Sequence, residues 1–72
     1  MKYRVGDLLV LRDTTKIVTT ALITKEYELN GLRFELTFED NQGKKTVCTY
    51  NYDELEHRFS KQFGWTHHRM VK

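Results

Sequence analysis

A chain reversal at Asn30-Gly31 constrains the fold of this sequence more than any other feature. The pair lies between two runs of strand-forming residues, 17–24 and 32–39. Asn-Gly favours a type I′ turn, because both central residues of that turn have a positive φ. The sequence therefore predicts a tight antiparallel hairpin and, with it, a small all-β domain.

The two arms of this hairpin differ in how clearly they show an inward face. After the turn, Phe34, Leu36 and Phe38 alternate with polar residues, so a strand turns these three side chains toward the core. The arm before the turn is ambiguous, and a bulge near residues 19–20 would reconcile its two apolar sets. These competing sets are Ile17, Ala21 and Ile23 on one side and Val18 and Leu22 on the other.

Three further segments fit strands. Residues 8–11 form a short apolar run bounded by turn formers, which is typical of a buried strand. Residues 40–43 form a four-residue hairpin loop that leads into a strand over 45–50. The segment Trp65–Val71 is compatible with a last strand, although its alternation is irregular.

Between the last two strands the hydrophobic period changes to that of a helix. Asn51 is a good N-cap, and Glu54 three residues later completes a capping-box pattern. Gly64 is a suitable C′ residue. The spacing predicts a helix from about residue 52 to about residue 63, with one apolar stripe. The stripe consists of Tyr52, Leu55, Phe59 and Phe63.

Size and composition favour a binding module over an enzyme. A chain of 72 residues forms a single domain, 1–72, which has no room for a deep substrate cleft. The single Cys48 cannot form an internal disulfide. The adjacent His67 and His68 point to opposite faces of a strand and do not easily share a metal ion with His57. We expect no catalytic residues, no metal and no cofactor.

The sequence also predicts a cytoplasmic protein without a membrane span. The N-terminus lacks the apolar region of a signal peptide, and no apolar run approaches 18 residues. The absence of a disulfide in so small a chain fits a reducing compartment. If the protein is viral, that compartment is the host cytoplasm.

The charge pattern has basic ends and an acidic middle. Residues 26–56 carry eight acidic residues against three basic ones, whereas residues 57–72 carry no acidic residue. A fold that brings the two ends together has one basic side and one acidic side. The alternative is a merely solubilising coat of charge.

The order of these elements resembles that of small SH3-like and Tudor-like barrels common among bacteriophage accessory proteins. The opening Tyr3-Arg4-Val5-Gly6-Asp7-Leu8-Leu9-Val10, the Ile23-Thr24 pair, the Phe38–Gly43 turn and the acidic segment Tyr52–Glu56 carry the resemblance, over residues 3–56. It implies a mainly β fold, namely a five-stranded antiparallel SH3-like barrel or half-barrel, with one C-terminal helix added. The helix is longer than in such barrels, and the tyrosines do not match the spacing of a Tudor aromatic cage.

We therefore expect a non-catalytic module that binds a host or viral protein, as a monomer or a symmetric homodimer. Single-stranded or double-stranded nucleic acid is the alternative ligand, because basic residues alternate with aromatic ones near the C-terminus. The candidate binding residues are Arg58, Lys61, Trp65, His67, His68 and Arg69, with Arg4 and Arg12 as neighbours.

Overall fold

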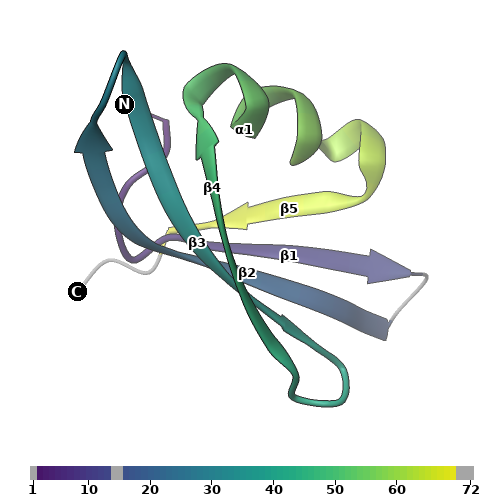
Figure 1. The fold of residues 1–72 in the computed structure, drawn as a ribbon. Helices are drawn as coiled ribbons and strands as arrows, with labels where there is room; N and C mark the ends of the chain where they lie inside the picture. The colour runs from purple at the N-terminus through teal and green to yellow at the C-terminus, as the bar shows by residue number, and fades with distance from the viewer. Residues whose placement is uncertain (1, 14–15, 70–72) are drawn as a thin grey trace.

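The computed structural model describes residues 2–13 and 16–69, which form one bent antiparallel sheet with a helix over its concave face (Figure 1). The described residues hold β1 (Leu8–Asp13), β2 (Lys16–Glu28), β3 (Leu32–Asp40), β4 (Lys45–Asn51), α1 (Tyr52–Arg58), the short 3₁₀ helix η1 (Lys61–Phe63) and β5 (Trp65–His68). The strand order is β4-β3-β2-β1-β5. The sheet does not close, so the predicted half-barrel with a C-terminal helix is confirmed.

The reversal at Asn30-Gly31 lies where the sequence predicts it. Asn30 has a φ of 52° and Gly31 a φ of 107°, so both residues adopt the positive φ that their residue types tolerate. The loop holds three residues, 29–31, because Glu28 pairs with Leu32. The Glu28 carboxylate accepts a hydrogen bond from the Gly31 N–H at 3.2 Å, which fixes the turn from within.

Two irregularities bend β2. The pairing with β1 omits Val18, one residue before the predicted bulge, and the pairing with β3 omits Thr24. Beyond Val18, Ala21 and Ile23 point into the core. Ile17, the third member of that candidate set, does not share this face: its side chain is 49% exposed, because the omitted residue reverses the alternation.

The helix begins as predicted and ends early. The side chain of Asn51 accepts from the Glu54 N–H at 2.8 Å, and the Glu54 carboxylate accepts from the Asn51 N–H at 2.9 Å, which completes the capping box. α1 then stops at Arg58, and the chain continues as η1. The predicted burial of Phe63 is therefore wrong, since this residue leaves the helical stripe and is 58% exposed.

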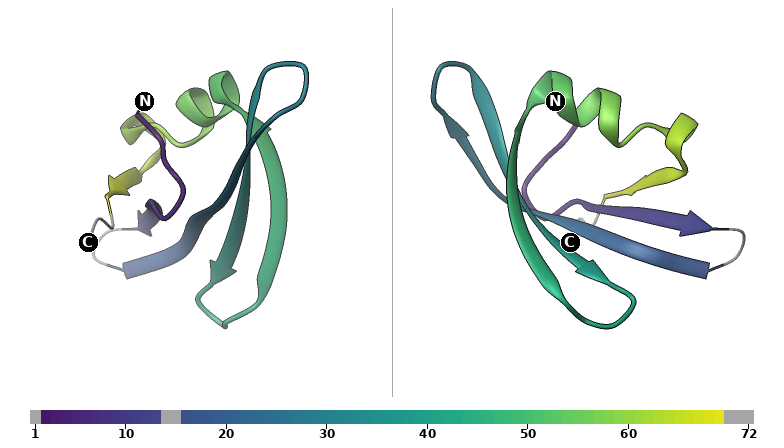
Figure 2. Two further views of the ribbon diagram at one scale, coloured as in Figure 1. Left: turned by 90° about the vertical axis from the view of Figure 1, so that its left-hand side faces the viewer. Right: turned by 45° about the vertical axis from the view of Figure 1, so that its right-hand side comes forward.

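The core fills the concave side of the sheet under α1 (Figure 2). Leu55 and Phe59 reach it from α1 and its C-cap, and Tyr3 reaches it from the segment before β1. Its buried members are Tyr3, Leu9, Ala21, Ile23, Phe34, Leu36, Leu55 and Phe59. β5 pairs with β1 from Leu8↔His68 to Leu11↔Trp65, so the first and last strands are neighbours as expected. The predicted strand ends at His68, and positions 70 and 71 lie outside the described residues.

The hairpin turn makes a direct test of the backbone argument. We expect Gly31→Ala to lower the free energy of unfolding by about 1–2 kcal/mol, the cost of a positive φ for an L-residue. No atom lies within 4 Å of a Cβ built at this position, so a clash does not contribute. D-alanine at position 31, introduced by chemical synthesis, is the control and should restore the stability. Equal losses for both enantiomers in urea denaturation would contradict the conformational argument.

Candidate functional site

An aromatic cavity opens where the sheet fails to close. It has a volume of about 400 Å³. Its lining residues come from β3 and β4 and from α1 with its C-cap, η1 and β5. Figure 2 shows the arrangement of these elements. We call this site the aromatic cavity; it is lined by Phe38, Tyr50, Arg58, Phe59, Phe63 and Trp65.

The rings of the aromatic cavity pack mainly edge to face around Phe59. Phe59 is almost fully buried, and its ring centroid lies 4.7 Å from that of Trp65 and 5.5 Å from that of Tyr50. The ring centroid of Phe38 lies 5.9 Å from that of Phe59 and 6.2 Å from that of Tyr50. Phe38 and Tyr50 share the concave face of the sheet, which explains why Phe59, the C-cap of α1, contacts both rings. Edge-to-face contacts are an arrangement that aromatic pairs prefer, so the cavity floor is well packed.

Phe63 and Arg58 form the exposed rim of the aromatic cavity. Phe63 belongs to η1 and turns most of its ring to solvent. Gly64 then reverses the chain with a φ of 88°, and its carbonyl accepts from the Arg12 N–H at 3.4 Å. The guanidinium of Arg58 lies 5.6 Å from the centroid of the Tyr50 ring, within cation–π distance. Apolar surface and positive charge thus lie side by side at the opening.

The environment of Tyr50 reflects this arrangement. Burial raises the pKa of its phenol above the ordinary 10.0, and the neighbouring thiol of Cys48 raises the pKa further. Arg58 opposes these effects, because its positive charge favours the phenolate. The phenol therefore stays neutral at physiological pH.

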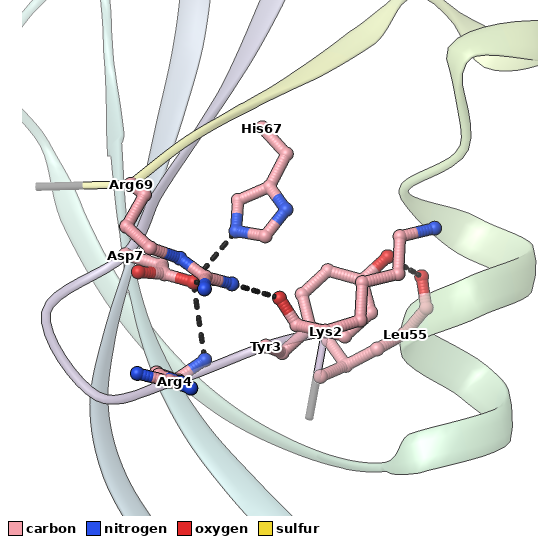
Figure 3. Close-up of polar contacts among 7 residues, drawn as sticks. All are labelled: Lys2, Tyr3, Arg4, Asp7, Leu55, His67 and Arg69. Carbon is pink, nitrogen blue, oxygen red and sulfur yellow. Dashed lines mark hydrogen bonds and ion pairs between the residues drawn. The ribbon is translucent and has the colours of Figure 1, made fainter.

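A buried carboxylate holds β5, and with it one wall of the aromatic cavity, against the rest of the sheet. Asp7 is 2% exposed and accepts from the Arg4 N–H at 3.1 Å (Figure 3). The same oxygen lies 2.6 Å from Nε2 of His67 and 3.6 Å from the Arg69 guanidinium. We call this group the Asp7 clasp; it joins the turn before β1 to the C-terminal strand.

Tyr3 continues the Asp7 clasp into the core. Its ring stacks on His67 at a centroid distance of 5.1 Å, and its hydroxyl lies 3.5 Å from the Leu55 carbonyl oxygen (Figure 3). Burial raises the pKa of Tyr3, with smaller contributions from Glu56 and Tyr52. The clasp thereby connects β5, the N-terminal segment and α1.

The structure separates the predicted binding residues into three groups. Arg58 and Trp65 line the aromatic cavity, and Lys61 begins η1 beside it. His67 and Arg69 bond to Asp7, and Arg69 also donates to the Lys2 carbonyl at 2.6 Å.

The remaining predicted residues, namely His68, Arg4 and Arg12, are exposed. His68 is exposed and hydrogen-bonds to Thr66 at 2.9 Å. Arg4 is exposed at the turn before β1, and Arg12 is exposed near the end of that strand.

Sequence reasoning missed both the ring set of the cavity and the role of Asp7. The sequence places Phe38 in the core and Asp7 among the turn formers before residue 8. One available signal is the alternation of basic and aromatic residues near the C-terminus, which includes four of the lining residues: Arg58, Phe59, Phe63 and Trp65. No local signal connects Asp7 with a histidine sixty residues later.

A second cavity, of about 230 Å³, lies at the Asn30-Gly31 turn. Asn51, one of its lining residues, is occupied by the capping box with Glu54, which leaves the aromatic cavity as the stronger candidate. Within residues 2–13 and 16–69, no three His, Cys, Asp or Glu side chains gather as they would around a metal ion. No helix in this described part of the chain is long and apolar enough to cross a bilayer.

Comparison with known proteins adds no relative. No family model matches the sequence, and neither a curated protein nor a solved structure is significantly similar to it. The site must therefore be interpreted from its own geometry.

The contact between Arg58 and Tyr50 predicts a measurable shift. Replacing Arg58→Met removes the positive charge that favours the phenolate, so the pKa of Tyr50 should rise further. Nuclear magnetic resonance of ring-labelled tyrosine measures this titration residue by residue. Lys61→Met removes the same charge and is the control; it should leave the pKa of Tyr50 unchanged. An unchanged or lower pKa in the Arg58 variant would show that the guanidinium does not face the ring.

The burial of Tyr3 predicts a loss of stability at alkaline pH. Because its pKa is raised above 10.0, the folded state retains a proton that the unfolded chain releases. This contribution to stability is complete below pH 10.0 and is lost as the pH rises through the folded-state pKa. Tyr3→Phe should therefore show a shallower alkaline decline in urea denaturation than the wild type. The control is Tyr27→Phe, because Tyr27 lies outside the core cluster; the stability of this variant should fall with pH as that of the wild type does.

Proposed function

We propose that the protein is a non-catalytic binding module and that the aromatic cavity receives a segment of a partner protein. The observation that carries this proposal is the exposed ring of Phe63, which adjoins the packed rings of Phe59 and Trp65. Exposed aromatic side chains next to a packed apolar floor are typical of residues that anchor protein interfaces.

The chemistry of the cavity suggests what its ligand carries. An apolar or aromatic side chain fits the ring-lined floor, and a carboxylate beside it pairs with Arg58 at the rim. Lys61 is exposed at the start of η1 and adds a second positive charge to this side. We therefore propose a partner segment with an apolar anchor and an adjacent acidic residue.

A methylated lysine fits the cavity poorly. Aromatic cages hold quaternary ammonium groups by cation–π attraction. Here the guanidinium of Arg58 already lies over the Tyr50 ring and repels a second cation. The local charge favours an anionic ligand instead.

Single-stranded nucleic acid is the second candidate. A base stacks on an exposed ring such as Phe63, and Arg58 and Lys61 suit the phosphates. His67 and Arg69, however, are bonded to Asp7, which reduces the basic surface that the sequence suggested. This loss is why we rank a protein partner first.

The resemblance to SH3-like phage accessory proteins guides the choice of partner. It makes a host protein, or a second viral protein, the first class to search. The proposal concerns the mode of binding, however, and stands on the aromatic cavity whatever the source of the partner.

The role of Phe63 can be tested with a matched pair of variants. Phe63→Ser should reduce retention of a discrete partner from nuclease-treated bacterial lysate by at least about tenfold, as expected when a central anchor is removed. Leu29→Ser is the control, because Leu29 is also 58% exposed but lies in the β2–β3 loop. The urea concentration at the midpoint of unfolding should be the same for both variants as for the wild type. Quantitative mass spectrometry of the retained proteins gives the comparison.

Titration with labelled single-stranded and double-stranded oligonucleotides separates the two candidates. A protein-binding module shows no binding at low salt, whereas a nucleic-acid binder loses affinity steeply as the salt concentration rises. Equal retention of partner by wild type and Phe63→Ser would contradict the proposed site. Salt-sensitive oligonucleotide binding that is lost in Phe63→Ser would replace the protein-binding function with the nucleic-acid one.

A further inference from the structure

The outer edge of β4 is an unprotected strand edge. Within the described residues, β4 pairs with β3 alone. Natural edge strands usually carry a proline, a bulge or charged residues, especially lysine, which discourage pairing with another chain. The charged residue of β4, Lys45, occupies its first position. Between Thr46 and Tyr50 the strand has no proline and no charge, and its register with β3 is continuous, so its central part lacks this protection. Val47 is moreover an apolar residue that is 59% exposed to solvent.

The backbone of β4 presents a regular set of hydrogen-bonding groups at this edge. The Asp40 N–H donates to the Lys44 carbonyl, so the alternating ladder directs residues 46, 48 and 50 toward β3. The N–H and C=O groups of Lys45, Val47 and Thr49 consequently point outward. The Asn51 N–H, which bonds to Glu54 rather than to β3, agrees with this alternation.

Charge along β4 changes sign from one end to the other. Lys44 and Lys45 lie at its start, and Asp53 and Glu54 follow its end in the first turn of α1. When two copies of this strand run antiparallel, the basic start of each lies beside the acidic end of the other. The charges of the edge are therefore complementary to those of a second, antiparallel copy of the same edge. A second copy of the chain is thus a sufficient partner.

We propose that two copies of the chain associate through antiparallel pairing of their β4 strands. Pairing centred on the middle residue of Lys45–Asn51 places the twofold axis at Cys48. The Asn51 N–H is already bonded to Glu54, so Asn51 contributes only its carbonyl to the pairing. Val47 of each copy then lies opposite Thr49 of the other, and the two residues exchange both backbone hydrogen bonds. The result is a continuous sheet across both copies. This inference rests on the β4 edge and is independent of the ligand of the aromatic cavity.

The same register makes a specific prediction about Cys48. Residues at the axis form a non-hydrogen-bonded pair, in which the Cα atoms lie about 4.5 Å apart. This separation falls within the range of about 4.4–6.8 Å that a disulfide spans. Because Cys48 is the single cysteine of the chain, any disulfide-linked dimer joins Cys48 to its counterpart.

Sedimentation equilibrium of the full-length protein, under reducing conditions and at increasing concentration, tests the pairing. The wild-type mass should approach twice 8.7 kDa. The double variant Val47→Lys/Thr49→Lys places lysines opposite lysines and should remain monomeric over the same concentrations. Leu22→Lys/Leu29→Lys adds the same charge at exposed positions away from the edge and should dimerise as the wild type does. Circular dichroism confirms that both variants are folded.

Mild oxidation with copper–phenanthroline supplies a second measurement. The wild type should form the disulfide-linked dimer rapidly, and Val47→Lys/Thr49→Lys should form it much more slowly. A monomeric wild type that does not cross-link faster than the double variant would overturn the proposal. So would a dimer that persists in the double variant, since its interface would lie elsewhere. Neither result bears on the binding assay of Phe63→Ser, so the two proposals fail separately.

Discussion

The Asp7 clasp is the interaction on which the arrangement of this small sheet depends. A carboxylate with 2% exposure is costly to bury unless its oxygens are bonded, and the Arg4 N–H, His67 and Arg69 all bond or pair with it. The backbone of Asp7 also contributes, because its carbonyl accepts from the Ile23 N–H at 3.0 Å. One residue thus joins the chain start, the middle of β2 and the end of β5.

The aromatic cavity follows from this closure together with the bend of the sheet. β5 is only four residues long and, among the residues that the structure describes, pairs with β1 alone, so the clasp at His67 supplements a short ladder. Holding β5 in place sets Trp65 against Phe59 on one side of the opening. The bend of β2 directs the β3–β4 hairpin away from β5, which keeps the opposite wall apart (Figure 2). The clasp and the bend of β2 together therefore produce the open half-barrel, and its opening forms the candidate site.

The sequence predicts the elements whose signals are local. Asn30-Gly31 specifies the hairpin and the Asn51–Glu54 pair specifies the helix start, because each acts through backbone preferences within a few residues. The end of the helix was predicted wrongly, since helical spacing alone does not reveal that the chain leaves the stripe at Phe59. The clasp and the cavity escaped prediction, because both depend on tertiary contacts between residues that are far apart in the sequence.

The most direct test of this account follows the emission of Trp65, the single tryptophan of the chain, in an Asp7→Asn variant. If the clasp positions β5, the variant retains its strand content but exposes Trp65, so its emission shifts to longer wavelength and acrylamide quenches it more strongly. Asp53→Asn, at an exposed helical position, should leave both properties unchanged. Wild-type emission and quenching in Asp7→Asn would show that the aromatic cavity forms without the clasp and would contradict the central claim.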